Sequence, residues 1–265
     1  MVFKSINYLV WDRVLVSLSF KTRIPVFDAN ICVGDLHDGL SFCRNRNQLL
    51  TEMDLHGVHR ALVYHVQAET ISPLDGNCYL ESWLDNGGRI YPQWLVMPSP
   101  DSIAQVQTLY AKGKVQSVRL YNTRAIGLPF RPWVYDGLLS WLSQVRVPTF
   151  ISLPDADSDE LVTTLSAYPR LVTVLVGAHY QHALWVRPVL AALPNVYLEL
   201  SRYEPIGEIE ALRDEFGARR LIYGSWYPRY AMGPMLFYLH HTTLTEAELA
   251  LVCAGNLTRI LEERL

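Results

Sequence analysis

The sequence has no long apolar run, no excess of basic charge and no closely spaced cysteines. No stretch approaches the roughly 18 uninterrupted apolar residues that a membrane-spanning helix needs. The 23 Lys and Arg residues are outnumbered by 26 Asp and Glu residues, which gives a net charge of −3. Because the chain has no basic stripe either, we expect no nucleic acid partner and no membrane partner.

The four cysteines are far apart in the sequence. Their spacing argues against a disulfide framework and against a zinc knuckle. The apolar stretch Tyr8–Trp11 is followed at once by Asp12 and Arg13, which makes it a poor signal peptide. These absences predict a globular, cytoplasmic protein. The cysteines are Cys32, Cys43, Cys78 and Cys253.

A large apolar fraction and a regular alternation of two patterns are present instead. Half of the 265 residues are hydrophobic, and this length fits one (β/α)8 barrel of about 250 residues. Short apolar runs alternate with segments of helical period, which is typical of βα units around a parallel sheet. The candidate strands are Val26–Cys32, Ala61–His65, Gln93–Met97, Val115–Tyr121, Thr149–Leu153, Val172–Gly177, Val196–Ser201 and Leu221–Ser225.

The segments between the strands carry helix signals. Leu49 and Met53 recur at helical spacing before Gly57. Asp101 is the predicted N-cap of a helix that ends before Gly113. About eight such units favour a closed (β/α)8 TIM barrel over an open doubly wound sheet. The open sheet is kept as the alternative, although no strand is followed by a glycine-rich phosphate loop.

We therefore expect a single domain over residues 1–265, with an N-terminal extension at 1–24 and the barrel at 25–265. Residues 229–242 lie between the last strand and the predicted final helix, Thr245–Leu261. They are expected either to cap the barrel or to line its mouth. The oligomeric state is left open, a homo-oligomer included.

In such barrels the reacting groups lie at the C-terminal ends of the strands and in the loops that follow. His65 with Glu69 beyond it, and His179, are the candidate catalytic residues at these ends. Imidazole exchanges protons near neutral pH, and a carboxylate can orient it. The candidate substrate-binding residues are Asn30, Cys32, Arg119, Tyr121, Ser201, Ser225 and Trp226.

For several of these candidates, a purely structural role is the alternative to a role in binding or catalysis. Strand alternation places Arg119 and Tyr121 on one face. The planar guanidinium of Arg119 suits a ligand carboxylate, but an internal ion pair with Glu199 is the alternative. Cys32 is an inert core residue unless a histidine activates it, and His65 is either a proton carrier or a histidine satisfied at its strand end.

Several segments together resemble one known family. They include Val26-Phe-Asp-Ala-Asn-Ile-Cys-Val-Gly34, Leu50–Ala61 and Pro194–Ser201. The most specific is Phe216-Gly-Ala-Arg-Arg-Leu-Ile-Tyr-Gly-Ser225 followed by Tyr227-Pro228. From about Pro25 to Leu261 the chain is similar to the amidohydrolase superfamily, in its amidohydrolase-2 branch of metal-dependent hydrolases and decarboxylases. The resemblance implies a TIM barrel.

The metal motif of that family is degenerate in this sequence. The resemblance implies a His-x-His pair on the first strand, where this chain has Asn30-Ile31-Cys32. It implies a carboxylate after the Gly-Ser of the eighth strand, where Trp226 stands. Only His179 corresponds to a histidine of the family, and one ligand is too few for a stable divalent site. We therefore predict that the protein uses no metal and no other cofactor.

Two functions follow from the resemblance. The first is a metal-independent hydrolase or lyase that acts on a small carboxylated molecule, similar to the branch of 2-pyrone-4,6-dicarboxylate lactonase, with Arg119 as the carboxylate clamp. The ligand partner would then be a small anion. The second is a catalytically inactive amidohydrolase fold that serves as a small-molecule binding or assembly module. The residues at positions 30, 32 and 226 motivate the second.

The ligand pattern generates a first testable prediction. Purified protein is expected to contain no stoichiometric zinc, manganese or iron, because Asn30, Cys32 and Trp226 replace good ligands by poor ones. Elemental analysis of the protein, before and after incubation with each metal and desalting, measures this directly. One equivalent of metal that survives desalting would contradict the prediction.

Overall fold

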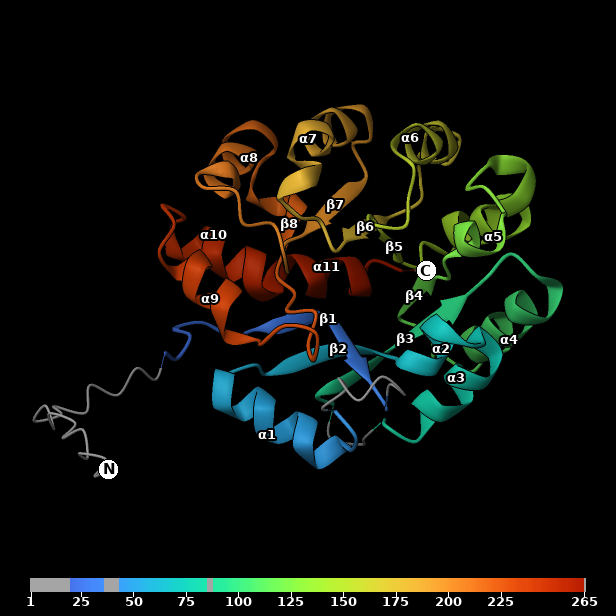
Figure 1. The fold of residues 1–265 in the computed structure, drawn as a ribbon, viewed down its shortest axis with the longest axis horizontal. Coiled ribbons are helices and arrows are strands. Elements are labelled where there is room, and N and C mark those ends of the chain that lie inside the picture. The colour runs from blue at the N-terminus through green and yellow to red at the C-terminus, as the bar shows by residue number, and fades with distance from the viewer. Residues whose placement is uncertain (1–19, 36–42, 85–87, 265) are drawn as a thin grey trace, which may run out of the picture.

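A computed structural model describes residues 20–35, 43–84 and 88–264. Eight parallel strands lie side by side in sequence order, which makes the fold a (β/α)8 barrel (Figure 1). Each predicted strand is confirmed to within a few residues. The strands are β1 (Phe27–Val33), β2 (Arg60–His65), β3 (Ile90–Val96), β4 (Ser117–Leu120), β5 (Thr149–Ser152), β6 (Thr173–Val176), β7 (Val196–Glu199) and β8 (Leu221–Ile222).

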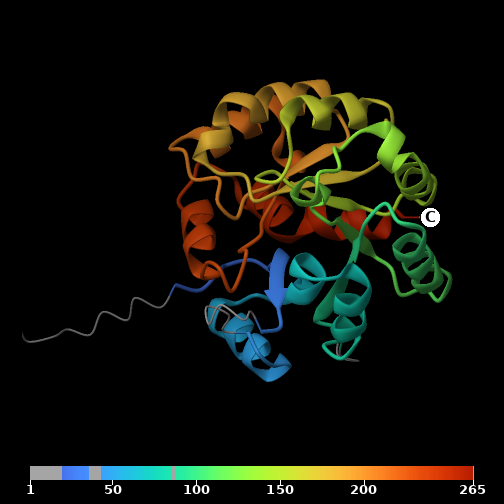
Figure 2. The same cartoon turned by 45° about the vertical axis from the view of Figure 1, so that its right-hand side comes forward.

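Helices follow the strands and cover the outside of the sheet, as the turned view shows (Figure 2). Their ends match the turn residues, since α1 stops at Gly57 and α8 stops at Gly217. The helices are α1 (Arg46–His56), α2 (Val66–Thr70), α3 (Pro73–Glu81), α4 (Pro100–Ala111), α5 (Pro132–Val145), α6 (Ser158–Ser166), α7 (Ala183–Ala192), α8 (Glu208–Phe216), α9 (Gly233–His240), α10 (Glu246–Ala250) and α11 (Asn256–Glu262).

Two details differ from the sequence prediction. The N-cap of α4 is Ser99, whose hydroxyl accepts from the backbone of Ser102, so the predicted cap at Asp101 is wrong and Asp101 lies in the first turn. The predicted final helix is interrupted by a π-helical turn at Leu251–Gly255, which separates α10 from α11. The predicted extension at 1–24 lies outside the described residues up to position 19.

The barrel closes loosely between its first and last strands. β8 has two residues and forms a ladder with β7, whereas its junction with β1 consists of isolated backbone bonds. The backbone N–H of Ala29 donates to Tyr223 at 3.2 Å, and that of Cys32 donates to Tyr227 at 2.7 Å. The register of β1 shifts between Asp28 and Ile31. The chain after β8 therefore lies directly against the end of β1.

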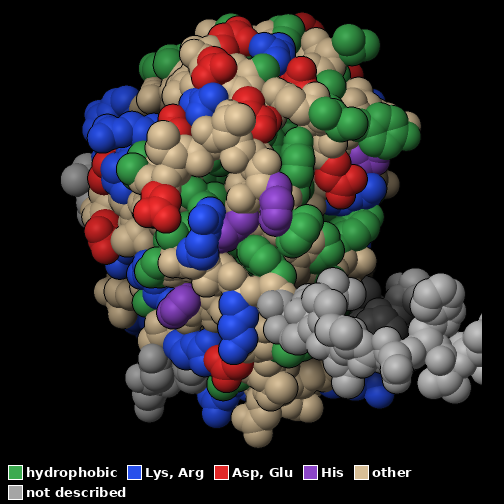
Figure 3. All heavy atoms as spheres, turned by 90° about the vertical axis from the view of Figure 1, so that its left-hand side faces the viewer, with side chains coloured by type: hydrophobic (Ala, Val, Ile, Leu, Met, Phe, Trp, Pro, Cys, Tyr) green, Lys and Arg blue, Asp and Glu red, His purple; other side chains and the backbone are tan. Residues whose placement is uncertain are grey.

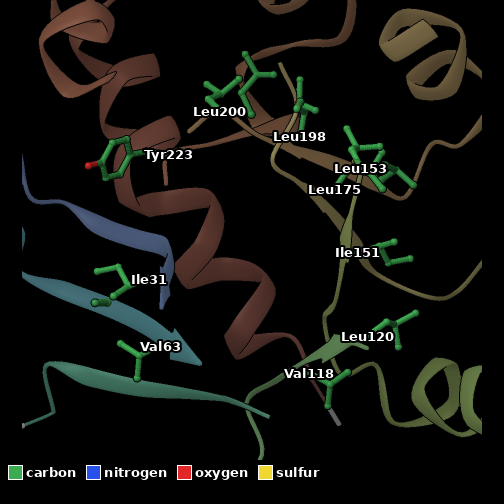
Figure 4. Packing of buried hydrophobic residues seen from close by; sticks show 14 of the residues in the cluster. Ile31, Val63, Val118, Leu120, Ile151, Leu153, Leu175, Leu198, Leu200 and Tyr223 are labelled. Carbon is green, nitrogen blue, oxygen red and sulfur yellow. The ribbon is translucent and has the colours of Figure 1, made fainter. Parts of the chain in front are cut away.

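The core has two parts because side chains alternate along each strand. Val118 and Leu120, like Ile151 and Leu153, pack outward with the helices in one large cluster (Figure 4). The residues between them face the barrel interior. Apolar interior side chains, Phe150 among them, pack against α11, and polar ones gather in the same interior. Arg119 is therefore an interior residue by register alone.

None of the described helices is long and apolar enough to span a membrane. Lys and Arg side chains are interspersed with Asp and Glu over the face in Figure 3. That face has no single basic patch, in agreement with the small net charge of −3.

The contact that fastens α11 generates a second prediction. The buried Asn256 amide donates to the carbonyl oxygens of Ala218 and Leu221, both at 2.8 Å. Asn256→Ala leaves both acceptors buried without these donors, so we expect a loss of about 2 kcal/mol in the free energy of unfolding. Urea denaturation checks this. The exposed Glu262 of the same helix provides the control, since Glu262→Ala is expected to change little; equal losses for both variants would contradict the prediction.

Candidate active site

Arg119 of β4 lies at the centre of the interior polar cluster. Its side chain is buried, and Nη1 donates to Asn30 Oδ1 and to Gln93 Oε1, each at 3.2 Å. The guanidinium lies 4.2 Å from the ring centroid of Tyr64, which supports its flat face. A buried cation is costly unless acceptors surround it, and two neutral amide oxygens and one ring meet only part of that need.

Asn30 connects Arg119 to a buried carboxylate. Its Nδ2 donates to Glu199 Oε2 at 3.3 Å, while its Oδ1 accepts from Arg119. Arg119 and Glu199, for which a direct ion pair was the alternative expectation, are thus joined through an amide. Burial raises the pKa of Glu199, and the N–H of Gly177 and both donors of Ser201 lower it.

Glu69 of α2 is the carboxylate that approaches Arg119. Its Oε1 lies 3.8 Å from Arg119 Nη2, and its Oε2 lies 3.4 Å from Arg229 Nη2. The sequence suggested instead that Glu69 orients His65. The ion pairs with the two arginines give Glu69 a different position, between a buried cation and a half-exposed one.

Trp226 occupies the position after the Gly-Ser of strand eight. Its ring lies over Gly177, so closely that a Cβ at Gly177 would meet it at 3.0 Å. The backbone φ of Trp226 is +58°, which is uncommon for a bulky residue and stores strain. The guanidinium of Arg229 lies 5.4 Å from the ring centroid. Trp226 therefore forms one wall of the interior beside the carboxylate–arginine pairs.

Ser225 and Asp28 form a separate buried contact under this wall. The N–H groups of Ser225 and Asn30 both donate to Asp28 Oδ1 at 3.0 Å. Burial raises the pKa of Asp28 from 3.8 to about 7, although these hydrogen bonds lower it. The Ser225 hydroxyl accepts from the N–H of Tyr227. Ser225 thus has a structural task in joining the end of the eighth strand to β1.

His65 does not share the interior face. It has the strand parity of Val63, which packs outward (Figure 4), and its ring lies 5.6 Å from that of Tyr79 in α3. Its Nδ1 accepts from the N–H of Gln67 as the cap of α2, so the proton of the neutral ring is on Nε2, beside Gly34. Burial lowers its pKa, which keeps the ring neutral at pH 7.

His179 lies at the end of β6 and also acts as a cap. Its side chain accepts from the N–H of Gln181, and its ring stacks on Tyr180 with centroids 4.7 Å apart. The ring of His182 contacts it edge-on at 5.5 Å. These contacts leave His179 at the rim of the barrel. Its strand, β6, is four strands away from β2, which carries His65.

The remaining candidates line the mouth. Cys32 packs in a small cluster with Tyr64 and Leu95, against which Tyr121 rests. Burial raises the pKa of the Cys32 thiol, so the thiol stays protonated. Ser201 and Glu204 line a cleft whose other walls come from the segment between β8 and α10. These lining residues include Tyr230, Ala231, Pro234, Met235 and Tyr238.

Several buried polar atoms of this interior have no hydrogen-bond partner among the described residues. The donors include Nη2 of Arg119, Nε2 of Gln93, Nε1 of Trp226 and the hydroxyl of Tyr64, and Oδ2 of Asp28 is an acceptor. Buried donors in native proteins are almost always paired with an acceptor. Arg119 and Gln93 are hydrogen-bonded to each other, and an acceptor-rich group is the chemistry that this interior lacks.

The described residues do not fit a divalent metal at the family's metal positions. Asn30 uses both ends of its amide, and its oxygen already faces the Arg119 cation at 3.2 Å. The Cys32 thiol is protonated, and the indole of Trp226 offers no lone pair. Within 20–35, 43–84 and 88–264, no group of three or more His, Cys, Asp or Glu residues could hold a metal ion. The expected absence of metal stays a prediction.

Sequence reasoning does not single out Arg229 or Tyr64. Alternation from Val63 would have placed Tyr64 inside the barrel and His65 outside it. Arg229 carries a weaker signal, as a basic residue three positions after Trp226 in the loop beyond the last strand. Its approach to Glu69 joins residues 160 positions apart, which only the closure of the barrel produces.

Comparison with known proteins gives a family and a fold. The sequence matches the family model described as Amidohydrolase over residues 44–262. No curated protein matches it. Among solved structures, 2,6-dihydroxybenzoate decarboxylase from Rhizobium has a TM-score of 0.71 and 14% identity, with 90% of this chain and 99% of that chain covered.

Two further structures agree. 5-Carboxyvanillate decarboxylase from Sphingomonas paucimobilis has a TM-score of 0.68 and 12% identity, covering 90% of this chain and 99% of its own. A dihydroxybenzoic acid decarboxylase from Polaromonas sp. JS666, with bound manganese and the inhibitor 2-nitroresorcinol, has a TM-score of 0.74 and 13% identity, covering 90% and 97%. At these identities the likeness shows the fold alone.

The buried carboxyl of Asp28 generates a third prediction. Because its folded-state pKa is raised to about 7, the folded protein holds a proton there that the unfolded chain releases above about pH 4. This contribution to stability is therefore present at low pH and lost as the pH rises to 7. Relative to the parent, Asp28→Asn should gain on the order of 2 kcal/mol in unfolding free energy between pH 5 and pH 8.

Urea denaturation of both proteins at the two pH values measures that gain. The difference between variant and parent cancels the other titrating groups, Glu199 included, to first order. A difference that is the same at pH 5 and pH 8 would show that Asp28 is ionised throughout.

Proposed function

This chain belongs to the amidohydrolase family, and on that premise we propose that it is a lyase or hydrolase acting on a small carboxylated molecule. Arg119 binds the carboxylate, and the reaction proceeds without a divalent metal. The family match over residues 44–262 supports the reaction class. The residues inside the barrel support the substrate class.

The observation that carries the proposal is the set of unpaired donors around Arg119. The guanidinium presents Nη2, the Gln93 amide presents Nε2 and the Trp226 indole presents Nε1, all buried and without hydrogen-bond partners among the described residues. A carboxylate brings two oxygens with about four lone-pair sites and a negative charge. It therefore satisfies several donors at once and neutralises the buried cation.

Aromatic side chains around the same place favour a planar ligand. Tyr64 lies under Arg119, Tyr121 rests against the cluster of Cys32 and Tyr64, and the ring of Trp226 packs over Gly177. Rings stack favourably on such surfaces. Similar solved structures are decarboxylases named for 5-carboxyvanillate and 2,6-dihydroxybenzoate, both carboxylated aromatic rings. By analogy, an aromatic carboxylic acid is the proposed ligand.

His65 and His179 are kept as the proposed proton-transfer groups, with Glu69 as the charged partner in the site. His65 is neutral at pH 7, since burial lowers its pKa, and its capping bond to Gln67 leaves the Nε2 proton for donation. Its outward parity means that it serves a substrate only at the rim. His65→Gln, which keeps one amide donor but cannot exchange a proton, separates this role from capping.

A second candidate function is a binding module without catalysis. Asn30 stands where the family resemblance implies a metal-binding histidine, and its amide bridges Arg119 and Glu199. A residue committed to this bridge has no reactive group to offer. Ligand binding without any turnover of the bound acid would favour the module over the enzyme.

Arg119→Met generates the fourth prediction. Binding of benzoate, measured by calorimetry, is expected to weaken by roughly 100-fold, because the variant loses the charge-assisted hydrogen bond from Nη2 together with the buried positive charge. Arg119→Lys keeps the charge without the planar fork and is expected to bind with intermediate affinity.

The control is Arg170→Met, which removes an exposed arginine on the loop before β6. Thermal unfolding of each variant checks that it is folded before titration. If a folded Arg119→Met protein binds benzoate as well as the parent, Arg119 is structural and the carboxylated substrate should be abandoned.

A further inference from the structure

Glu69 is in an unusual position for a surface carboxylate. It lies between two arginines, one buried and one half exposed, with side-chain exposures of 2% for Arg119 and 44% for Arg229. Glu69 itself is 22% exposed. Its carboxylate therefore lies at the boundary between the interior cluster and solvent.

The pair between Glu69 and Arg119 is incomplete. Glu69 Oε1 is 3.8 Å from Arg119 Nη2, whereas a charge-assisted hydrogen bond spans about 2.7–2.9 Å. Nη2 accordingly has no hydrogen-bond partner among the described residues, while Nη1 is saturated by Asn30 and Gln93. The Glu69 carboxylate is close enough to compensate the charge of Arg119, but it accepts no hydrogen bond from Nη2.

The backbone of α2 holds Glu69 at that distance. α2 packs on α3 so closely that a Cβ at Gly76 would lie 2.0 Å from the backbone nitrogen of Ala68. The helix is also capped by the His65 side chain. The backbone is thus fixed on both sides, so a change in the position of the Glu69 carboxylate requires a rotation of its side chain.

We propose that Glu69 is a resident carboxylate that a ligand carboxylate replaces between Arg119 and Arg229. The inference rests on the proposed function, because it presumes that Arg119 receives the ligand carboxylate. The incoming carboxylate makes the bond to Nη2 that Glu69 cannot reach, and Arg229 is its second contact. Glu69 then turns outward.

This exchange makes Glu69 a specificity-determining residue. A neutral ligand that displaces Glu69 leaves the buried Arg119 cation without a counter-charge, which is costly. An anionic ligand restores the charge. Glu69 therefore discriminates against uncharged analogues of the same shape, and it does so at the expense of affinity for the correct ligand.

The test compares benzoate with its neutral analogue benzamide on the whole protein. Glu69→Gln keeps the shape of the side chain and removes its charge. Benzoate is expected to bind the variant on the order of tenfold more tightly, because no resident carboxylate has to be displaced from the two arginines first. Benzamide is expected to bind the parent weakly and to gain affinity in the variant, where it no longer displaces the counter-charge of Arg119. The control Asp75→Asn removes one exposed acidic charge from the start of α3 and should leave both affinities unchanged.

Arg229→Gln completes the set and should weaken benzoate binding, though less than Arg119→Met does. If Arg119→Met loses benzoate while Glu69→Gln binds it equally or more weakly than the parent, the resident-carboxylate inference is overturned and the proposed function stands. If Arg119→Met binds benzoate normally, the proposed function is overturned. Absence of benzoate binding to both the parent and Glu69→Gln at millimolar concentration overturns both.

Discussion

The Asn30 amide is the contact on which the interior of this barrel depends. Its oxygen accepts from Arg119 at 3.2 Å and its nitrogen donates to Glu199 at 3.3 Å, so one neutral side chain joins a buried cation to a buried anion. An ionised aspartate at this position could accept from Arg119 but could not donate to Glu199. The bridge allows opposite charges to share a dry interior without a direct ion pair.

Charge balance extends outward from that bridge in two directions. Toward β6 and β7, Glu199 accepts hydrogen bonds from Gly177 and Ser201. Toward α2, the negative Glu69 and the positive Arg229 follow Arg119 in an alternating series of charges that reaches the surface. The unpaired donors occur where these two directions meet, at Arg119, Gln93 and Trp226. The Arg119 cation lies between the two, joined to Glu199 through Asn30 on one side and 3.8 Å from Glu69 on the other.

Much of the fold was predictable from local patterns. Apolar runs and turn residues located all eight strands. Alternation within Val118-Arg-Leu-Tyr121 placed Arg119 on the face opposite Val118 and Leu120, and the structure shows that Val118 and Leu120 pack outward. The same reasoning applied to β2 would have turned His65 outward, but its place at a strand end suggested a pocket residue. Parity along a strand is a stronger constraint than position at its end, since each side chain has only two faces to choose from.

The sequence by itself determined the elements, their order and the chemistry available at the strand ends, because periodicity and side-chain type are local properties. Which groups meet was decided by the tertiary structure alone. Glu69 and Arg229 are 160 positions apart, and Asn30 and Glu199 are 169. They come together because the chain after β8 lies against the end of β1. Neither spacing nor composition records that closure, since it depends on how eight strands tilt and twist around a common interior.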